Sequence, residues 1–394
     1  MPNPLTQRLR ESLEGLKAEK RFRTIPILQS EQKAHVRLNG RDVVMLSSNN
    51  YLGLADHPKL KEAAREGIQR YGCGTASVRF ICGTMDIHRE LEAEIAAFVG
   101  AEDALLYSSC AAANEGLIPA LMGEGDLICS DGLNHASIID GIRLSRAARH
   151  IHPHRDLAAL EAGLTAHADA GLKMVVTDGV FSMEGDLAPL PEMADLADRH
   201  GAFLVVDESH ALGILGENGR GTAEHLGVED RVRIQTGTLG KSLGGAMGGY
   251  VAGSRDLIDH LTQTSRPYIF SNALPPAIVF VALAALKLIR EDPSPRERLR
   301  GSTAYFRREM GTAGFNIIQG FHPIVPVLIG DTPKALEMSA ALFEEGIFVT
   351  GFGFPVVPKG EARLRAQISA AHTRDDLDQC LEAFRAVGRR FGVM

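Results

Sequence analysis

Short runs of consecutive apolar residues recur through the middle of the chain, and each is followed by glycines or polar residues. Such runs are typical of strands that are buried on both faces of a parallel sheet. Patterns of helical period lie between most of them, and this alternation predicts an α/β fold with a mostly parallel sheet covered by helices on both faces. The predicted strands are Ala104–Tyr107, Leu127–Ser130, Met174–Asp178, Phe203–Val206, Arg233–Gly237 and Gly249–Ala252.

The segments on either side of this sheet have different patterns. Charged and apolar positions alternate like an exposed amphipathic helix as far as about Arg23, and a short β segment follows at Ala34–Leu46. The apolar run Pro275–Leu288, broken only by Lys287, predicts a buried helix that begins at prolines and is too short to cross a bilayer. After a break at Glu291–Pro295 we expect a second domain. The expected division is an N-terminal helical arm and β segment (1–50), a large cofactor-binding domain (51–290) and a small α+β domain (291–394).

The composition fits a large soluble enzyme and argues against several other classes of protein. The chain has 394 residues, 45% of them hydrophobic, and its net charge of −7 comes without a basic stretch dense enough for nucleic acid. The N-terminus lacks the apolar core of a secretory signal, so we expect neither export nor a membrane partner. The cysteines are odd in number and lack CxxC spacing, which argues against a zinc site or disulfide framework and favours the cytoplasm. They are Cys73, Cys82, Cys110, Cys129 and Cys380.

A single lysine, Lys241, lies among glycines and hydroxyl residues directly after the predicted strand Arg233–Gly237. A free ammonium keeps its proton at neutral pH, so a reactive lysine needs burial, nearby positive charge or capture as an imine. Gly240 and its neighbours leave room for a flat cofactor, and the nearby hydroxyls could hold a phosphate. The lysine could instead bind phosphate in a nucleotide loop, but the G-x-x-x-x-G-K-[ST] spacing is missing.

An acid, Asp207, follows the apolar run Phe203–Val206, and ligands of open α/β sheets gather at the carboxyl ends of strands. Taken alone, an aspartate at the end of a strand usually caps the next helix. Asp207 and Lys241 together suggest pyridoxal phosphate, whose ring nitrogen needs a carboxylate and whose aldehyde needs an amine. His210 follows Asp207 closely enough to hydrogen-bond the ring hydroxyl.

Four strings extend this interpretation over nearly the whole chain: Ser48–Leu54, Ala76–Thr84, Asp131–Ser137 and Arg363–His372. With them the chain resembles the α-oxoamine synthases, which are fold-type I pyridoxal-phosphate enzymes that join an amino acid to an acyl-CoA. The resemblance implies an aminotransferase-like fold with a seven-stranded type of sheet and a homodimer whose site is shared between subunits. Ala76–Thr84 most resembles the branch of the family that uses glycine and acetyl-CoA.

The resemblance also assigns cofactor-binding roles residue by residue. Lys241 matches the Schiff-base lysine and Asp207 the partner of the ring nitrogen, while His210 and Ser182 match residues near the ring hydroxyl. His135 matches the histidine that stacks on the ring, although in its Asn-His-Ala-Ser string it could equally be a turn or cap residue. The phosphate site would use the start of a helix in Ser108–Asn114, where Ala111 and Ala112 replace bulkier residues. Its residues would be Cys110 and Ala111 through their amides, Thr238, and Ser271 and Asn272 of a second subunit.

Arg365 is the expected partner of the substrate carboxylate, because a planar guanidinium matches carboxylate geometry. Asn49 would supply a second donor, and His135 would also reach the substrate. Arg363 and Arg365 alternate along a predicted strand and share one side of it, so a solvated strand face remains an alternative for both. Only the resemblance selects Arg365.

The activity that the resemblance implies is condensation of glycine with acetyl-CoA to 2-amino-3-oxobutanoate and CoA. In reverse it would cleave that ketoacid in threonine breakdown. Lys241, His135, Asp207 and His210 would be the catalytic residues, with no metal. Two alternatives stay open: another α-oxoamine synthase, such as one that uses alanine and a long dicarboxylic acyl-CoA to make 8-amino-7-oxononanoate, and a cofactor-bound scaffold without chemistry.

Overall fold

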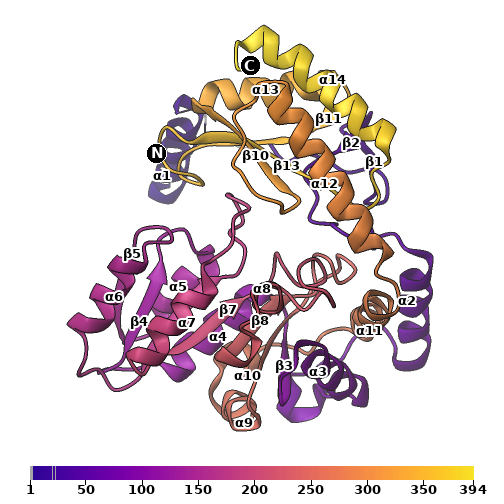
Figure 1. Ribbon diagram of the computed structural model, residues 1–394. Coiled ribbons are helices and arrows are strands. Elements are labelled where there is room, and N and C mark those ends of the chain that lie inside the picture. Colours follow the sequence, from indigo (N-terminus) through magenta and orange to yellow (C-terminus); the bar gives the residue numbers. More distant parts are fainter. Residues whose placement is uncertain (1–2, 20, 23) are drawn as a thin grey trace.

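A seven-stranded sheet forms the core of the lower part of the computed structural model in Figure 1, and the model describes residues 3–19, 21–22 and 24–394. The strand order is β3-β9-β8-β7-β6-β4-β5, and the pairs from β8 to β5 are parallel while β9 is antiparallel to both neighbours. The expectation of a mostly parallel sheet is therefore confirmed. The strands are β3 (Asp103–Tyr107), β4 (Leu127–Asp131), β5 (Ala148–His152), β6 (Lys173–Asp178), β7 (Phe203–Asp207), β8 (Val232–Thr238) and β9 (Gly249–Gly253).

Six of these strands match the predicted runs to within one residue at each end, whereas β5 was not predicted. β5 is the edge strand and reads Ala-Arg-His-Ile-His, with two exposed residues at its start and only His152 buried. A strand with one neighbour and little buried surface needs no apolar run.

Helices cover both faces of the sheet, as the alternating pattern predicts. One hydrophobic cluster joins the sheet to α4 (Cys110–Leu121), α5 (Ala136–Leu144) and α9 (Arg255–Thr264). A second cluster on other side chains of the sheet includes residues of α6 (Leu157–Ala166), α7 (Leu190–Arg199) and α8 (Thr222–Leu226). Both clusters contain alternate residues of β6 and β7, as expected for strands buried on both faces.

The predicted buried helix in Pro275–Leu288 is α11 (Pro276–Glu291). It packs against α2 (Pro58–Tyr71) and α3 (Asp86–Val99). The approach to α2 is close at Gly67, where an added Cβ would lie 2.9 Å from the Pro276 carbonyl oxygen. The short helical turn η1 (Arg79–Gly83), α10 (Arg266–Ile269) and the 3₁₀ turn η2 (Glu229–Arg231) complete this part of the chain.

The C-terminal part packs three helices against two small sheets. Its first sheet has the order β10-β13-β12, and its second joins the N-terminal hairpin β1–β2 to β11. The short β segment expected at Ala34–Leu46 is this hairpin, and its parallel partner β11 comes from the other end of the chain. The elements are α12 (Ser294–Thr312), α13 (Thr332–Glu344), α14 (Arg374–Phe391), β1 (His35–Leu38), β2 (Arg41–Met45), β10 (Ile324–Gly330), β11 (Ile347–Phe348), β12 (Thr350–Phe352) and β13 (Ala362–Gln367).

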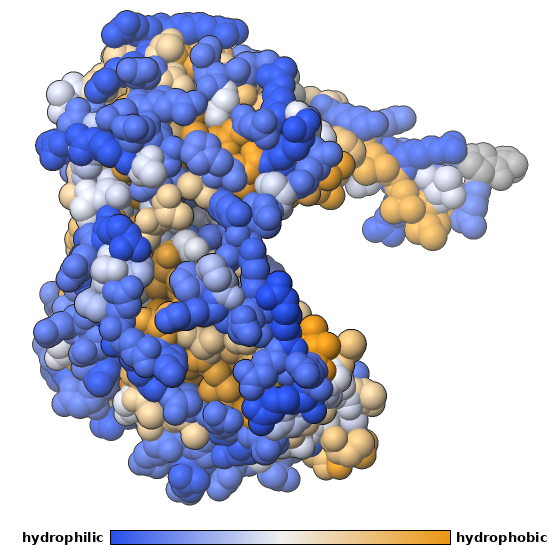
Figure 2. All heavy atoms as spheres, turned by 90° about the vertical axis from the view of Figure 1, so that its right-hand side faces the viewer, coloured by the Kyte–Doolittle hydropathy of each residue, from blue (hydrophilic) through white to orange (hydrophobic). Residues whose placement is uncertain are grey.

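The expected N-terminal helix is α1 (Pro4–Ala18), which ends before Arg23, a residue that lies outside the described residues. Figure 2 shows this helix as an arm that stands away from the body of the molecule, with hydrophobic side chains gathered along one side. Leu5, Leu9 and Leu13 form that side and are 62%, 54% and 45% exposed. Within the described ranges, none of the helices combines the length and apolar character that membrane crossing requires.

Candidate active site

Three neighbouring parallel strands have their carboxyl ends on the same side of the large sheet, and the last residues of β6 and β7 are in register with a residue near the end of β8. Asp178 of β6 lies beside Asp207 of β7, which lies beside Thr236 of β8. The carboxylate of Asp207 is 4% exposed and accepts hydrogen bonds from Asn114 Nδ2 at 2.8 Å, Ser209 N at 2.9 Å and Cys110 Sγ at 3.3 Å. The structure therefore places Asp207 as expected, at the carboxyl end of a buried strand.

The pKa values of the two neighbouring carboxyl groups, Asp207 and Asp178, are shifted in opposite directions. Burial alone would raise the pKa of Asp207, but hydrogen bonds from Ser209 and Asn114 and the charge of Lys241 outweigh it and hold the pKa below its usual value. Burial and the charge of Asp207 raise the pKa of Asp178 well above its usual range. The charged form is thus favoured for Asp207 and disfavoured for Asp178.

Lys241 lies in the turn that follows β8, close enough to Asp207 for their charges to interact. Burial lowers the pKa of the Lys241 amine, and the charge of Asp207 opposes part of this effect. A buried amine with a lowered pKa is easier to deprotonate, which is what a nucleophile or base requires.

His135 caps the N-terminus of α5, and its own N–H donates to Asp178 Oδ2 at 2.7 Å. Burial lowers its pKa, so the ring is neutral. Nδ1 accepts the Ser137 N–H at 3.2 Å and lies 2.8 Å from Ser137 Oγ, which leaves the ring proton on Nε2. Ser137 Oγ accepts in turn from Asn114 Nδ2 at 3.0 Å, so the His135 and Asp207 positions share one hydrogen-bond network. The structure supports the cap interpretation and is compatible with ring stacking.

The expected anion site lies at the start of α4. Ser109 caps this helix by accepting from Ala112 N, and Cys110 and Ala111 are its first residues, as predicted. The helix start packs so tightly on β9 that a Cβ at Gly249 would lie 2.3 Å from Cys110 N. A helix N-terminus favours an anion such as a phosphate. The Thr238 hydroxyl already lies 3.1 Å from the Gly248 carbonyl oxygen, so it would have to rotate to reach a phosphate.

The structure separates the two arginines that the sequence left equivalent. Both are buried, which excludes a solvated strand face: Arg363 is 1% exposed and Arg365 is 7% exposed. The Arg363 guanidinium donates hydrogen bonds to Glu184, Glu361 and the Met183 carbonyl oxygen. Arg365 donates only to Ser182 Oγ at 3.5 Å, and its buried Nε has no partner among the described residues. A buried guanidinium with free donors is a site for an anion such as a carboxylate.

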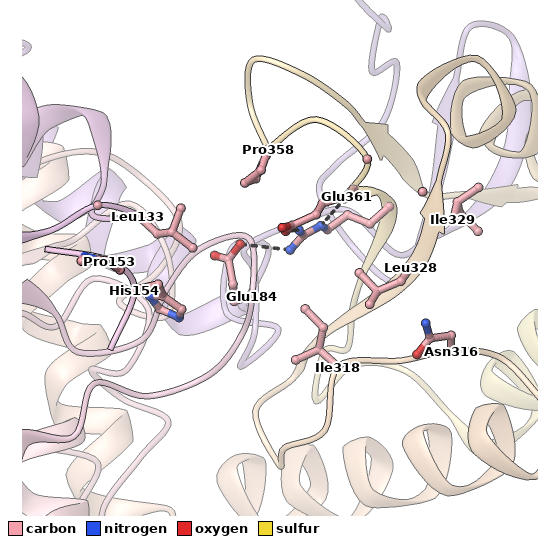
Figure 3. Close-up of a pocket in the computed structure, with 14 residues that line it drawn as sticks. Leu133, Pro153, His154, Glu184, Asn316, Ile318, Leu328, Ile329, Pro358 and Glu361 are labelled. Carbon is pink, nitrogen blue, oxygen red and sulfur yellow. Dashed lines mark hydrogen bonds and ion pairs between the residues drawn. The ribbon is translucent and has the colours of Figure 1, made fainter. Parts of the chain in front are cut away.

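A cleft of about 660 Å³ opens beside these residues, and Lys241 does not line it. The pair Glu184–Arg363 joins the loop after β6 to β13 within the cleft (Figure 3). The cleft thus lies between the large sheet's loops and the C-terminal sheets. The lining residues that Figure 3 labels are Leu133, Pro153, His154 and Glu184 on one side of the cleft and Asn316, Ile318, Leu328, Ile329, Pro358 and Glu361 on the other.

His154 in this cleft is expected to make stability depend on pH. Its ring nitrogens lie 3.1 Å from Asp131 and 3.1 Å from Asp186, and although burial alone would lower its pKa, these carboxylates raise the pKa to about 9. The ion pairs therefore stabilise the fold fully below about pH 6.5, and this contribution disappears as the pH rises through about 9. We expect His154→Gln to lower the free energy of unfolding by about 2–3 kcal/mol at acid pH and by little at alkaline pH, measured by urea unfolding.

The control for this prediction is His200→Gln, because His200 Nε2 lies 3.8 Å from Glu161 in a looser pair. A His154→Gln deficit that is equal across the pH range would contradict the ion-pair interpretation.

The structure shows fewer contacts for the remaining predicted residues, Ser271, Asn272 and Asn49. Ser271 and Asn272 follow α10, Asn272 is exposed, and it forms a β-bridge with Val78. Asn49 accepts a hydrogen bond from Gln367. Among the described residues, no group of three or more His, Cys, Asp or Glu could hold a metal ion.

Three residues at the site were missed from the sequence: Asn114, Tyr51 and Gln367. Tyr51 OH lies 2.9 Å from His210 Nδ1, and Gln367 Nε2 contacts both Tyr51 and Asn49. A strand period of two residues from Arg365 would have pointed to Gln367, and a helical period of four from Cys110 would have pointed to Asn114. Tyr51 lies in a turn and has no such signal.

The donor set fits pyridoxal phosphate. Asp207 supplies a buried charge for a ring nitrogen, Lys241 an amine, α4 a helix start for phosphate and Arg365 a guanidinium with a free Nε donor for a substrate carboxylate. Burial and the charges of Lys241 and Arg365 lower the pKa of His210 well below its usual value, so its neutral ring can hydrogen-bond a ring hydroxyl.

Comparison with known proteins gives four results: a family, two relatives and a solved structure. Residues 41–384 match the family described as aminotransferase class I and II. The chain is 49% identical over 391 residues, 98% of each chain, to 2-amino-3-ketobutyrate coenzyme A ligase of Escherichia coli K12. It is 46% identical to 8-amino-7-oxononanoate synthase of Symbiobacterium thermophilum, over 99% of this chain and 100% of the other. Its fold matches serine palmitoyltransferase of S. paucimobilis, solved with a PLP–myriocin aldimine, with a TM-score of 0.94 at 31% identity and full coverage of both chains.

Proposed function

Since the chain belongs to the class I and II aminotransferase family, we propose that it is a pyridoxal-phosphate-dependent glycine C-acetyltransferase. The reaction joins glycine to acetyl-CoA and gives 2-amino-3-oxobutanoate and CoA, and it runs in reverse as a CoA-dependent cleavage in threonine catabolism. The observation that carries the proposal is the meeting of Asp207 and the buried Lys241, at the carboxyl ends of strands of the large sheet, with the Arg365 guanidinium of β13, which has a free Nε donor.

The residues present would hold pyridoxal phosphate from several sides. Lys241 would hold it covalently and Asp207 would pair with its ring nitrogen. The cofactor supplies an electron sink for the negative charge that forms at the substrate α-carbon. The further proposed contacts are His135 against the ring, His210 and Ser182 near its hydroxyl, and Cys110, Ala111, Thr238 and a second subunit's Ser271 and Asn272 around the phosphate.

The chain's own groups account for binding and proton transfer. Arg365 and Asn49 would bind the glycine carboxylate, and the Nε2–H of His135 would orient the substrate. The Lys241 amine would take the α-proton of glycine, which its lowered pKa permits. A carbon–carbon bond to the acetyl group replaces the thioester carbon–sulfur bond of acetyl-CoA, and CoA leaves as the thiol with the proton that Lys241 Nζ took from the α-carbon. Asp207 remains ionised throughout, because its hydrogen bonds outweigh the effect of burial.

A second candidate activity is that of an 8-amino-7-oxononanoate synthase, which is favoured by the relative at 46% identity. It would use the same lysine, aspartate and arginine with alanine and a longer acyl donor. A panel of amino acids and acyl-CoAs distinguishes the two activities, because the best pair identifies the branch.

We also propose a homodimer that shares its sites, working in the cytoplasm. The exposed apolar side of α1 and the surface position of Asn272 support a second subunit on these elements. The free, exposed Cys73 and Cys82 support a reducing compartment. Analytical ultracentrifugation of the holoenzyme tests the dimer, and a monomer with full activity would contradict it.

The proposed function is tested by an absorbance spectrum followed by substrate addition. We expect a visible cofactor band that shifts with glycine, and free thiol that is released only when acetyl-CoA is added. A protein that responds only to alanine and a longer acyl donor would belong to the other branch. A colourless protein that takes up no pyridoxal phosphate would overturn the proposal.

A further inference from the structure

The side-chain amide of Gln367 has a fixed orientation. Gln367 is 1% exposed, and its Nε2 lies 3.3 Å from the Ser48 carbonyl oxygen, 2.6 Å from Asn49 Oδ1 and 3.3 Å from Tyr51 OH. A backbone carbonyl oxygen can only accept, so the NH₂ group of Gln367 must face Ser48. Asn49 therefore has to present its oxygen to Gln367.

This orientation decides which end of Asn49 is free. Its Oδ1 is taken by Gln367, and within the described residues no hydrogen bond involves its Nδ2. Arg365 lies two residues before Gln367 on β13, so their side chains share one face of the strand. β13 thus carries both side chains. Arg365 supplies the guanidinium for a substrate carboxylate, and the Gln367 amide binds Asn49 Oδ1, so that the Asn49 N–H groups point away from Gln367.

The contact of Gln367 with Tyr51 has a parallel effect on His210. Tyr51 is fully buried, and its OH lies 2.9 Å from His210 Nδ1. The Tyr51 hydroxyl has two acceptors within reach, Asn49 Oδ1 at 3.5 Å and His210 Nδ1 at 2.9 Å, and the shorter contact favours donation to Nδ1. Burial raises the pKa of Tyr51 to about 12, so the hydroxyl keeps its proton. The His210 proton then lies on Nε2. The charged and titratable groups around His210 are Lys241, Arg365, His322, His135 and Tyr51.

We propose that Gln367 and Tyr51 are positioning residues that act as one unit: Gln367 presents the Asn49 N–H groups to the substrate carboxylate, and Tyr51 holds the His210 proton toward the cofactor hydroxyl. The proposal rests on the proposed function, because it names the residues that orient its substrate and cofactor donors.

Substitution of Gln367 tests the carboxylate half. Gln367→Met keeps the length and removes the donor, and we expect the glycine KM of the holoenzyme to rise about two- to ten-fold, with the acetyl-CoA KM unchanged. Gln367→Glu keeps the shape of the side chain, but an ionised carboxylate only accepts hydrogen bonds. The Asn49 amide then flips to donate to Glu, and its oxygen faces the substrate carboxylate. We expect a larger rise for Gln367→Glu than for Gln367→Met, seen also in glycine Kd from the shift of the visible band. Equal or absent effects would overturn this half.

Tyr51→Phe tests the cofactor half, because it removes the hydroxyl and keeps the ring. Without a fixed donor from His210, the cofactor's ring oxygen becomes more basic, and we expect the pH midpoint of the visible band to rise by about 0.3–1 unit. An unchanged midpoint would overturn the role of Tyr51.

Ser369→Ala is the matched control. Its hydroxyl donates to the Asn50 carbonyl oxygen at 2.7 Å and joins the same two segments without touching Asn49 or His210. We expect lower stability but wild-type glycine KM and band midpoint, and equal shifts in this variant would overturn the positioning roles. Thiol release by the wild-type holoenzyme tests the proposed function separately. If the wild type releases thiol and the Gln367 and Tyr51 variants leave the glycine KM and the band midpoint unchanged, only the positioning roles are overturned.

Discussion

Replacement of Lys241 by alanine is expected to abolish glycine-dependent thiol release while the fold remains intact. Lys241 Nζ is proposed both to hold the cofactor covalently and to remove the substrate α-proton, so one substitution removes two functions. A positioned base alone contributes about 10²–10⁴-fold to rate, and the loss should exceed that range. The measurement is thiol release with glycine and acetyl-CoA, with circular dichroism to confirm the fold.

The matched control for this experiment is Lys287→Ala, because Lys287 is a solvent-exposed lysine on α11 with a side chain that is 72% exposed. We expect its activity to equal that of the wild type. A small primary amine added to Lys241→Ala is expected to restore part of the activity by occupying the space of the missing amine. Activity near the wild-type level in Lys241→Ala without added amine would remove Lys241 from the mechanism.

The parts of the fold that the sequence predicted are those where burial alone determines the pattern. β6 and β7 are covered on both faces, so their residues form unbroken apolar runs with Asp178 and Asp207 at their ends. β5 has one neighbour and mostly exposed or half-buried side chains, and its sequence carries no such run. The pairing of β2 with β11 was equally hidden, because two short strands from opposite ends of the chain have no local signal for each other.

The residues of the candidate site also divide into those that the sequence predicted and those that only the structure shows. Asp207 and Lys241 follow predicted strands, so the rule that ligands gather at strand ends was enough to bring them together. The partners of the site residues depend on hydrogen bonds between distant segments. Asn114 on α4 donates to Asp207, and Tyr51 contacts His210. The roles of Ser271 and Asn272 stay predictions, since they require a second subunit.

Arg363 and Arg365 show most clearly what three-dimensional information adds. In sequence they share one side of a strand and are equivalent, whereas in the structure one is saturated with partners and the other is not. The glycines, hydroxyls and charges that suggest a cofactor site do not reveal which guanidinium is free, because that depends on where Glu184 and Glu361 lie.

Arg365→Ala is therefore expected to raise the glycine KM about 10- to 150-fold, which corresponds to about 1.5–3 kcal/mol for a hydrogen bond to a charged group. The acetyl-CoA KM should change little, because the guanidinium is proposed to contact only the amino acid. Arg365→Lys should recover part of the loss, since a lysine gives a single point charge instead of a planar fork. Steady-state kinetics with each substrate varied in turn provides the measurement.

Arg363→Ala provides the contrast, because its guanidinium joins Glu184 to Glu361 and is 1% exposed. Removing one partner of a buried ion pair leaves an unpaired charge, so we expect a loss of about 3–5 kcal/mol in the free energy of unfolding. A glycine-selective rise in KM is not expected, because the Arg363 donors are already occupied. If the glycine KM rises selectively in Arg363→Ala and stays unchanged in Arg365→Ala, the substrate carboxylate binds at Arg363, and the free donors of Arg365 serve another purpose.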